Sequence, residues 1–166
     1  MNHYSVTLQG IDKTTALGAV IAEHLRPGDR VLLQGEMGVG KTTLARSIGA
    51  ALQAVPPLSS PTFILLSEHS GRLPIWHLDA YRLGPGADPN ASGLLDERQL
   101  LGVTLIEWPD YFGIFADSRL GVSDLHLTIT RSDEELRSVD LRTGDANRLA
   151  AIAVQWQTQH AGATAR

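Results

Sequence analysis

Eight consecutive residues, 35–42, read Gly-Glu-Met-Gly-Val-Gly-Lys-Thr and fit the pattern G-x-x-x-x-G-K-[ST]. An apolar run at 31–34 precedes this loop, and residues 42–52 follow it with helix-forming residues on a helical period. The glycines allow the backbone to wrap closely around phosphate oxygens, and the following helix adds the positive end of its dipole. The order of strand, glycine loop and helix therefore predicts a phosphate-binding loop within an α/β fold.

The positions of this loop have distinct predicted roles. Lys41, one of only two lysines among 14 basic residues, is expected to reach the β- and γ-phosphates as a point charge. The Thr42 hydroxyl is a candidate ligand for Mg²⁺, and Thr43 is expected to contact the α-phosphate. Backbone N–H groups of the preceding loop residues are expected to bind phosphate oxygens: Glu36, Met37, Gly38, Val39 and Gly40.

Two further apolar runs, 75–79 and 103–107, each end in a carboxylate, Asp79 and Glu107. Parallel strands present their carboxyl ends at the ligand-binding edge of a sheet, so either acid can hold Mg²⁺ or orient an attacking water. A solvated strand end or a surface ion pair is the alternative for either acid taken alone. His77 shares a strand face with Asp79, but without a third ligand nearby we interpret it as packed or hydrogen-bonded.

Three other features have two interpretations each. The segment Ser-Pro-Thr-Phe at 60–63 lies where nucleotidases of this fold place a loop that senses the γ-phosphate, so Thr62 can serve the metal or water, or simply enter a strand. Trp108 can stack near a nucleotide or pack against the core. Tyr81 and Arg82 can stabilise charge or form a structural pair.

Length and composition bound the class of protein. A chain of 166 residues fits one domain, expected at 1–160, with a disordered tail at 161–166. The absence of cysteine excludes disulfides, thiolate nucleophiles, iron–sulfur clusters and cysteine-ligated zinc. With 14 basic and 18 acidic residues, the chain lacks the excess of basic residues that is typical of a stand-alone RNA binder. No signal segment and no run of ~20 apolar residues occur, so we expect a cytoplasmic protein.

Hydrophobic periodicity predicts interleaved strands and helices. Strands are expected at 3–8, 31–34, 62–68, 73–79, 103–106, 125–130 and 136–142. Helices are expected after a cap at Asp12, at 42–52, at 94–101 and around a final stripe that includes Leu149 and Trp156. The glycine- and proline-rich stretch 83–92 is expected to be a mobile loop. This order predicts a three-layer α/β, P-loop NTPase-like fold with a central mixed parallel and antiparallel sheet.

Four motifs together resemble the TsaE (YjeE-like) family of bacterial P-loop ATPases. They are the loop at 35–43, S-P-T-F at 60–63, H-L-D-A-Y-R-L at 77–83 and I-E-W-P at 106–109. Their order and spacing match the family over roughly residues 14–143, and the combination is far more specific than the loop by itself.

The resemblance implies a small Mg²⁺-dependent ATPase required, with TsaB and TsaD, for threonylcarbamoyl modification of the adenosine next to the anticodon of tRNA. It implies that the chain binds the TsaB–TsaD complex and that ATP hydrolysis, slow in the isolated chain, resets this complex between turnovers. The sequence pI near 5.8 agrees with tRNA being held chiefly by those other subunits.

The resemblance also implies roles for individual residues. Lys41 and the loop backbone hold the phosphates, Thr42 and Glu107 resemble the Mg²⁺ ligands, and Asp79 resembles the acid needed for hydrolysis.

Thr62 belongs to the family's switch-like loop, and Trp108 is implied to lie beside the nucleotide. Arg137 is the best match to an arginine that the family often places near the nucleotide. The stretch 84–90 departs from the family, because it is rich in glycine and proline where many members carry acidic residues.

Other classes are open from the residues alone. A P-loop kinase acting on a small metabolite usually needs a lid with an arginine, but 83–92 contains no cation. A GTPase switch module needs an [NT]-K-x-D motif, and neither lysine lies in one. A nucleotide-dependent binding module without turnover is the third alternative, which the paired acids disfavour.

Overall fold

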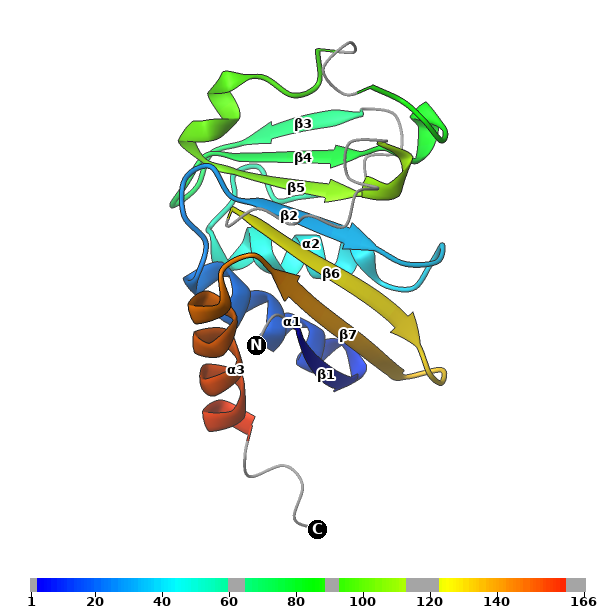
Figure 1. Ribbon diagram of the computed structural model, residues 1–166, viewed down its shortest axis with the longest axis vertical. Helices are drawn as coiled ribbons and strands as arrows, with labels where there is room; N and C mark the ends of the chain where they lie inside the picture. Colours follow the sequence, from blue (N-terminus) through cyan, green and yellow to red (C-terminus); the bar gives the residue numbers. More distant parts are fainter. Residues whose placement is uncertain (1–2, 60–64, 89–92, 113–122, 161–166) are drawn as a thin grey trace.

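The computed structural model describes residues 3–59, 65–88, 93–112 and 123–160, and its centre is a seven-stranded sheet (Figure 1). The strand order is β1-β7-β6-β2-β5-β4-β3. The strands are β1 (His3–Gln9), β2 (Arg30–Gln34), β3 (Leu66–His69), β4 (Ile75–Asp79), β5 (Val103–Glu107), β6 (Asp124–Arg131) and β7 (Leu136–Thr143). The four strands β6, β2, β5 and β4 run parallel, whereas β1, β7 and β3 pair antiparallel with their neighbours. The predicted mixed sheet is confirmed.

Within the described ranges, three α-helices and three short 3₁₀ helices accompany the sheet. The α-helices are α1 (Gly10–Glu23), α2 (Lys41–Ala51) and α3 (Ala146–His160). The 3₁₀ helices are η1 (Tyr81–Leu83), η2 (Glu97–Leu101) and η3 (Pro109–Tyr111). Apolar residues of all three α-helices share one large core with the sheet, while a smaller core on the other side contains Leu32, Leu78, Ile106 and Phe112. The predicted α/β fold with three layers is thus confirmed.

Several predicted boundaries were displaced. The first helix begins at Gly10, whose φ of +75° makes the turn from β1, so Asp12 lies in the first turn and does not cap it. The short helix predicted at 94–101 is the 3₁₀ helix η2, and it starts at Glu97, where the Asp96 carboxylate caps it by accepting the Arg98 N–H. Part of the strand predicted at 62–68 lies outside the described residues, as do 89–92 of the predicted loop.

The position of α2 depends on close contact with α1. A Cβ added at Gly18 of α1 would lie 2.5 Å from the Cβ of Ser47 in α2, a distance that real side chains do not adopt. Glycine at this position therefore allows the two helices to touch along their backbones.

Among the described residues no helix is both long enough and apolar enough to cross a membrane. The division into one domain and a tail stays a prediction, since 161–166 are not among the described residues.

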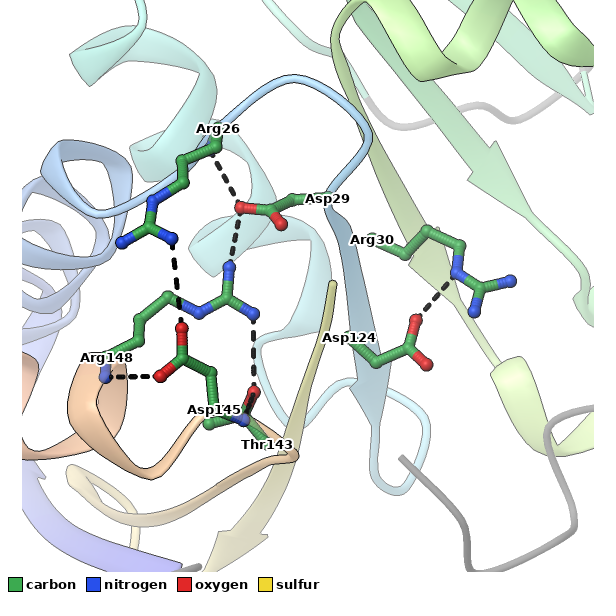
Figure 2. Close-up of polar contacts among 7 residues, drawn as sticks. All are labelled: Arg26, Asp29, Arg30, Asp124, Thr143, Asp145 and Arg148. Atoms are coloured by element: carbon green, nitrogen blue, oxygen red, sulfur yellow. Dashed lines mark hydrogen bonds and ion pairs between the residues drawn. The ribbon is translucent and has the colours of Figure 1, made fainter. Parts of the chain in front are cut away.

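A buried ion pair ties the start of β2 to α3, at the end of the sheet away from the glycine loop (Figure 2). Arg148 donates from Nη1 to Asp29 Oδ2 at 2.6 Å, and the Arg26 N–H donates to the same oxygen at 2.8 Å. Arg148 and Asp29 are only 3% and 4% exposed. The neighbouring pair of Arg30 and Asp124, 2.6 Å apart, links the first residues of β2 and β6. These contacts fix where β2 begins and hence where the glycine loop follows it.

Removing one partner of the buried pair is expected to destabilise the fold strongly. Asp29→Ala leaves the Arg148 guanidinium buried without its carboxylate, so the free energy of unfolding should fall by about 3–5 kcal/mol. Urea unfolding followed by circular dichroism measures this change. Arg98→Ala is the control, because the pair of Arg98 with Asp96 is exposed and its loss should shift the midpoint far less. Equal shifts in the two variants would contradict the prediction.

Candidate functional site

The glycine loop connects β2 to α2 through backbone conformations that favour glycine. Gly35 has φ +148°, and a Cβ there would lie 2.5 Å from the carbonyl oxygen of Ile129 on β6. Gly40 precedes α2 with φ +119° and ψ 16°, in the left-handed region. Glycine is therefore needed at position 35 because a side chain would clash, and at position 40 because the backbone is left-handed. The loop leads directly into the N-terminus of α2.

Lys41 is the first residue of α2 and lies folded over the loop. Its Nζ donates to the carbonyl oxygens of Gly35 and Glu36, both at 2.7 Å, and it lies 3.8 Å from the centre of a ring of Trp108. Only 4% of the residue is exposed. Burial lowers the pKa of Lys41 below its ordinary value, although the nearby carboxylates of Glu107 and Asp79 oppose this. The ammonium is held by backbone dipoles and by the indole face.

Thr42 and Glu107, the two predicted Mg²⁺ ligands, are brought together by the fold. Thr42 Oγ1 donates to Glu107 Oε2 at 2.8 Å, and Glu107 Oε1 lies 2.8 Å from His77 Nε2. Glu107 is 2% exposed and His77 is fully buried. The predicted interpretation of His77 as a hydrogen-bonded histidine is confirmed, whereas the assignment of Thr42 and Glu107 as metal ligands stays a prediction.

Asp79 ends β4 directly beside the end of β5. The parallel register pairs Asp79 with Glu107, so the two carboxylates emerge at the same edge of the sheet. Asp79 Oδ1 accepts the N–H of Tyr81 at 3.0 Å. Burial raises the pKa of Asp79 and the Glu107 carboxylate adds to this, while the Tyr81 N–H and the Lys41 ammonium lower it. The pKa of Asp79 is raised overall, and shifted pKa values are common among groups in functional sites.

Trp108 belongs to an aromatic cluster that borders the loop. Its backbone has φ +58°, in the left-handed region that a bulky residue adopts only at a cost of about 1–3 kcal/mol. Ring centres of Tyr81 and Tyr111 lie 4.9 and 5.5 Å from that of Trp108. Trp108 therefore packs against the smaller core and also covers Lys41, so the two sequence interpretations of this residue are not exclusive. A role of Trp108 beside a nucleotide stays a prediction.

Two arginines of the hairpin formed by β6 and β7 hold the glycine loop. Arg137 donates from Nε to the Val39 carbonyl oxygen at 3.0 Å, and Arg131 donates from Nη2 to the Gly38 carbonyl oxygen at 3.1 Å. The sequence pointed to Arg137 but missed Arg131. The signal that could have indicated Arg131 is the hairpin register, which pairs it with Arg137 across the two strands. Contact of Arg137 with a nucleotide stays a prediction, and its observed role is to support the loop.

Two cavities meet at the loop. One of about 270 Å³ is lined by Lys41, Thr42 and the two predicted acids, and the other, of about 340 Å³, lies between the loop, the start of α1 and the hairpin. Gly38, Gly40 and Thr43 line both. The first cavity is also lined by Met37, Lys41, Thr42, Asp79, Tyr81, Glu107 and Trp108. The second is also lined by Leu8, Gly10, Ile11, Thr14, Val39, Leu44, Ile129, Glu134, Glu135, Arg137 and Val139.

The structure leaves the predicted role of one site residue untested. Thr62, with the whole segment 60–63, lies outside the described residues, so its predicted role near the γ-phosphate stays a prediction. Glu36 contributes its carbonyl oxygen to Lys41, while its backbone N–H remains only a predicted phosphate contact.

The architecture and the loop define an α/β protein of the P-loop-like fold, and comparison with known proteins agrees. The family model described as Threonylcarbamoyl adenosine biosynthesis protein TsaE matches residues 8–141. The chain therefore belongs to the TsaE family, whose members take part in the biosynthesis of threonylcarbamoyladenosine in tRNA.

Individual relatives give the same result. Proteins with the name tRNA threonylcarbamoyladenosine biosynthesis protein TsaE include one from Bacillus subtilis, 30% identical over 77% of this chain and 78% of the relative. Another, from Mycobacterium tuberculosis, is 37% identical over 63% of this chain and 67% of the relative. A third, from Nostoc sp., is 45% identical, and the match spans 45% of this chain and about half (46%) of the relative. The crystal structure of YdiB from Bacillus subtilis shares the fold, with a TM-score of 0.66, 22% identity and 95% of each chain covered.

The raised pKa of Asp79 predicts that this carboxylate destabilises the nucleotide-free protein at neutral pH. A folded-state pKa above the ordinary value of 3.8 means that the contribution of Asp79 to stability is fully present below pH 3.8 and is lost as the pH rises through the folded-state pKa. Asp79→Asn, which can still accept the Tyr81 N–H, should raise the urea midpoint at pH 7 in EDTA.

The gain should narrow as the pH is lowered through the folded-state pKa. Asp110→Asn, at an exposed acid of η3, is the control and should give no comparable gain. A destabilised Asp79→Asn protein at pH 7 would refute this account of the carboxylate.

Proposed function

We propose that this chain is a Mg²⁺-dependent ATPase that acts in the cytoplasm with TsaB and TsaD in the threonylcarbamoyladenosine modification of tRNA. The observation that carries the proposal is one cavity lined by Lys41, Thr42, Asp79 and Glu107 at the N-terminus of α2. It combines a cation for phosphate, a hydroxyl and carboxylate for Mg²⁺, and a second carboxylate for the attacking water. Membership of the TsaE family supplies the pathway.

The pair of adjoining cavities supports a whole nucleotide as the ligand. The 270 Å³ cavity has the loop and α2 N-terminus that suit phosphates, and the 340 Å³ cavity has apolar walls from Ile11, Leu44 and Val139 that suit a nucleoside. Because Gly38, Gly40 and Thr43 line both, a single ligand can span them while its α-phosphate lies at Thr43.

The side chains suit the steps of phosphoryl transfer to water. Lys41 would exchange its bonds to the Gly35 and Glu36 carbonyl oxygens for bonds to phosphate oxygens. Thr42 and Glu107 offer the oxygen donors that Mg²⁺ prefers, and the bound ion would neutralise charge on the phosphates. Asp79, next to Glu107, would orient the attacking water and accept its proton, and its raised pKa makes it a better base than an ordinary aspartate.

Charge supports a role for partner proteins. The formal net charge is −4, with 18 acidic against 14 basic residues, which does not favour direct binding of a polyanion such as tRNA. Contact with tRNA is therefore expected through the TsaB–TsaD complex, whose state ATP hydrolysis by this chain would reset.

Loss of the Lys41 ammonium is expected to weaken ATP binding. Hydrogen bonds to charged groups contribute about 1.5–3 kcal/mol each, so Lys41→Ala should lower ATP affinity by at least about 10-fold. Isothermal titration calorimetry with ATP and Mg²⁺ measures this. Lys13→Ala, which removes the other lysine from α1, is the matched control and should bind like the wild-type chain. Unchanged affinity in Lys41→Ala would exclude the loop as the phosphate site.

Turnover is expected to depend on the acids and on the partners. The isolated chain should hydrolyse ATP slowly and faster when the TsaB–TsaD complex is added, as measured by phosphate release. Asp79→Asn and Glu107→Gln should fold but lose this stimulated turnover. A strain depleted of its own TsaE should regain threonylcarbamoyladenosine in tRNA with the wild-type chain and not with Asp79→Asn.

Two results would separate the parts of this proposal. Hydrolysis without stimulation by TsaB–TsaD would argue against the partner role and leave a generic ATPase. Wild-type rates in both acid variants would overturn the assigned catalytic residues.

A further inference from the structure

A buried chain of hydrogen bonds runs from α2 through β5 to β4. Thr42 Oγ1 donates to Glu107 Oε2, and Glu107 Oε1 is bonded to His77 Nε2, both at 2.8 Å. Among the residues that the structure describes, each carboxylate oxygen of Glu107 therefore has one partner, and the two partners come from different elements of the fold. A carboxylate held from both sides cannot rotate about its last bond without breaking one of these contacts.

The hydrogen-bond pattern assigns the tautomer of His77. An ionised carboxylate only accepts, so the proton that joins the two side chains lies on Nε2 of His77. Nδ1 of His77 is buried and has no hydrogen-bond partner among the described residues. The described contacts thus make the ring a donor to Glu107 through Nε2.

The sheet gives this donor a fixed position. β4 and β5 are parallel neighbours, with His77 opposite Leu105 and Asp79 opposite Glu107. His77 is fully buried, so packing restricts its ring to one orientation. The Thr42 hydroxyl retains lone pairs for a cation while its proton points at Glu107.

We propose that His77 is a positioning residue that holds the Glu107 carboxylate in the orientation needed to bind a divalent cation together with Thr42. The proposal rests on the proposed Mg²⁺-dependent function and adds to it a residue that touches neither the nucleotide nor the metal. Partners that orient metal-binding carboxylates typically change metal affinity by about 10- to 100-fold when they are removed.

Two variants of His77 separate positioning from packing. His77→Leu fills similar space without a donor, whereas the amide nitrogen of His77→Gln lies near the position of the imidazole Nε2 and can restore the bond. His69→Leu is the matched control, because His69 is also buried, on the adjacent β3, but bonds to Ser67 and to the Pro56 carbonyl oxygen.

The experiment measures two affinities for each protein. Mn²⁺ binding to the ADP complex is followed by electron paramagnetic resonance, and ADP binding in EDTA is followed by calorimetry. His77→Leu should weaken Mn²⁺ binding by about 10- to 100-fold and leave ADP affinity in EDTA within about twofold of wild type. His77→Gln should recover most of the Mn²⁺ affinity, and His69→Leu should retain it.

Other results overturn the proposal. Wild-type Mn²⁺ affinity in a folded His77→Leu protein would do so, as would a parallel fall of both affinities that His77→Gln fails to reverse. If the wild-type chain binds ADP but no Mn²⁺, the metal part of the proposed function fails and this proposal fails with it. If the wild-type chain binds both ADP and Mn²⁺ and only the affinities of the His77 variants differ from those expected, the proposed function stands and this proposal alone is wrong.

A measurement on the unaltered chain covers the case in which His77→Leu does not fold. In ¹⁵N-labelled histidine spectra, His77 should be protonated at Nε2, and adding Mg²⁺ to the ADP complex should shift its resonances more than those of the other histidines. A His77 signal protonated at Nδ1, or one unmoved by Mg²⁺, would overturn the proposal.

Discussion

The parallel register of β2, β5 and β4 is the constraint on which the candidate site depends. Leu33 near the end of β2 lies opposite Glu107, and Glu107 lies opposite Asp79. The glycine loop leaves β2 at this edge and delivers Thr42 on the first turn of α2 to within a hydrogen bond of Glu107. A shift of one residue in any of these pairings would turn a carboxylate to the other face of the sheet.

Charged groups at the two ends of the sheet have different surroundings. At the start of β2, Asp29 and Arg148 are buried together as a direct ion pair at 2.6 Å (Figure 2). At the other end, burial raises the pKa of Asp79 and lowers that of Lys41, so each charged form is held against its solvation preference. Charges at the start of β2 are thus paired, which makes this end rigid, whereas charges at the loop have shifted pKa values. Such shifted groups are typical of proteins that use them in binding or chemistry.

Much of the fold was predictable because its signals are local. The strand, glycine loop and helix around Gly35 and Lys41 are specified by residues adjacent in sequence, and the acids Asp79 and Glu107 close recognisable apolar strands. The start of α1 at Gly10 was missed because a left-handed glycine, and not the acid two residues later, makes the turn. The 3₁₀ form of η2 could not be predicted from periodicity.

The sequence by itself determined the mixed α/β fold, the phosphate-type loop and the membership of a family defined by four spaced motifs. Only the tertiary structure decided which side chains meet: Glu107 between Thr42 and His77, Trp108 over Lys41, and Arg131 beside Arg137 on the loop carbonyls. The physical reason is range. Glycine conformation, helix period and strand period act over a few residues, whereas these contacts join residues that are up to 98 positions apart and depend on strand order and register.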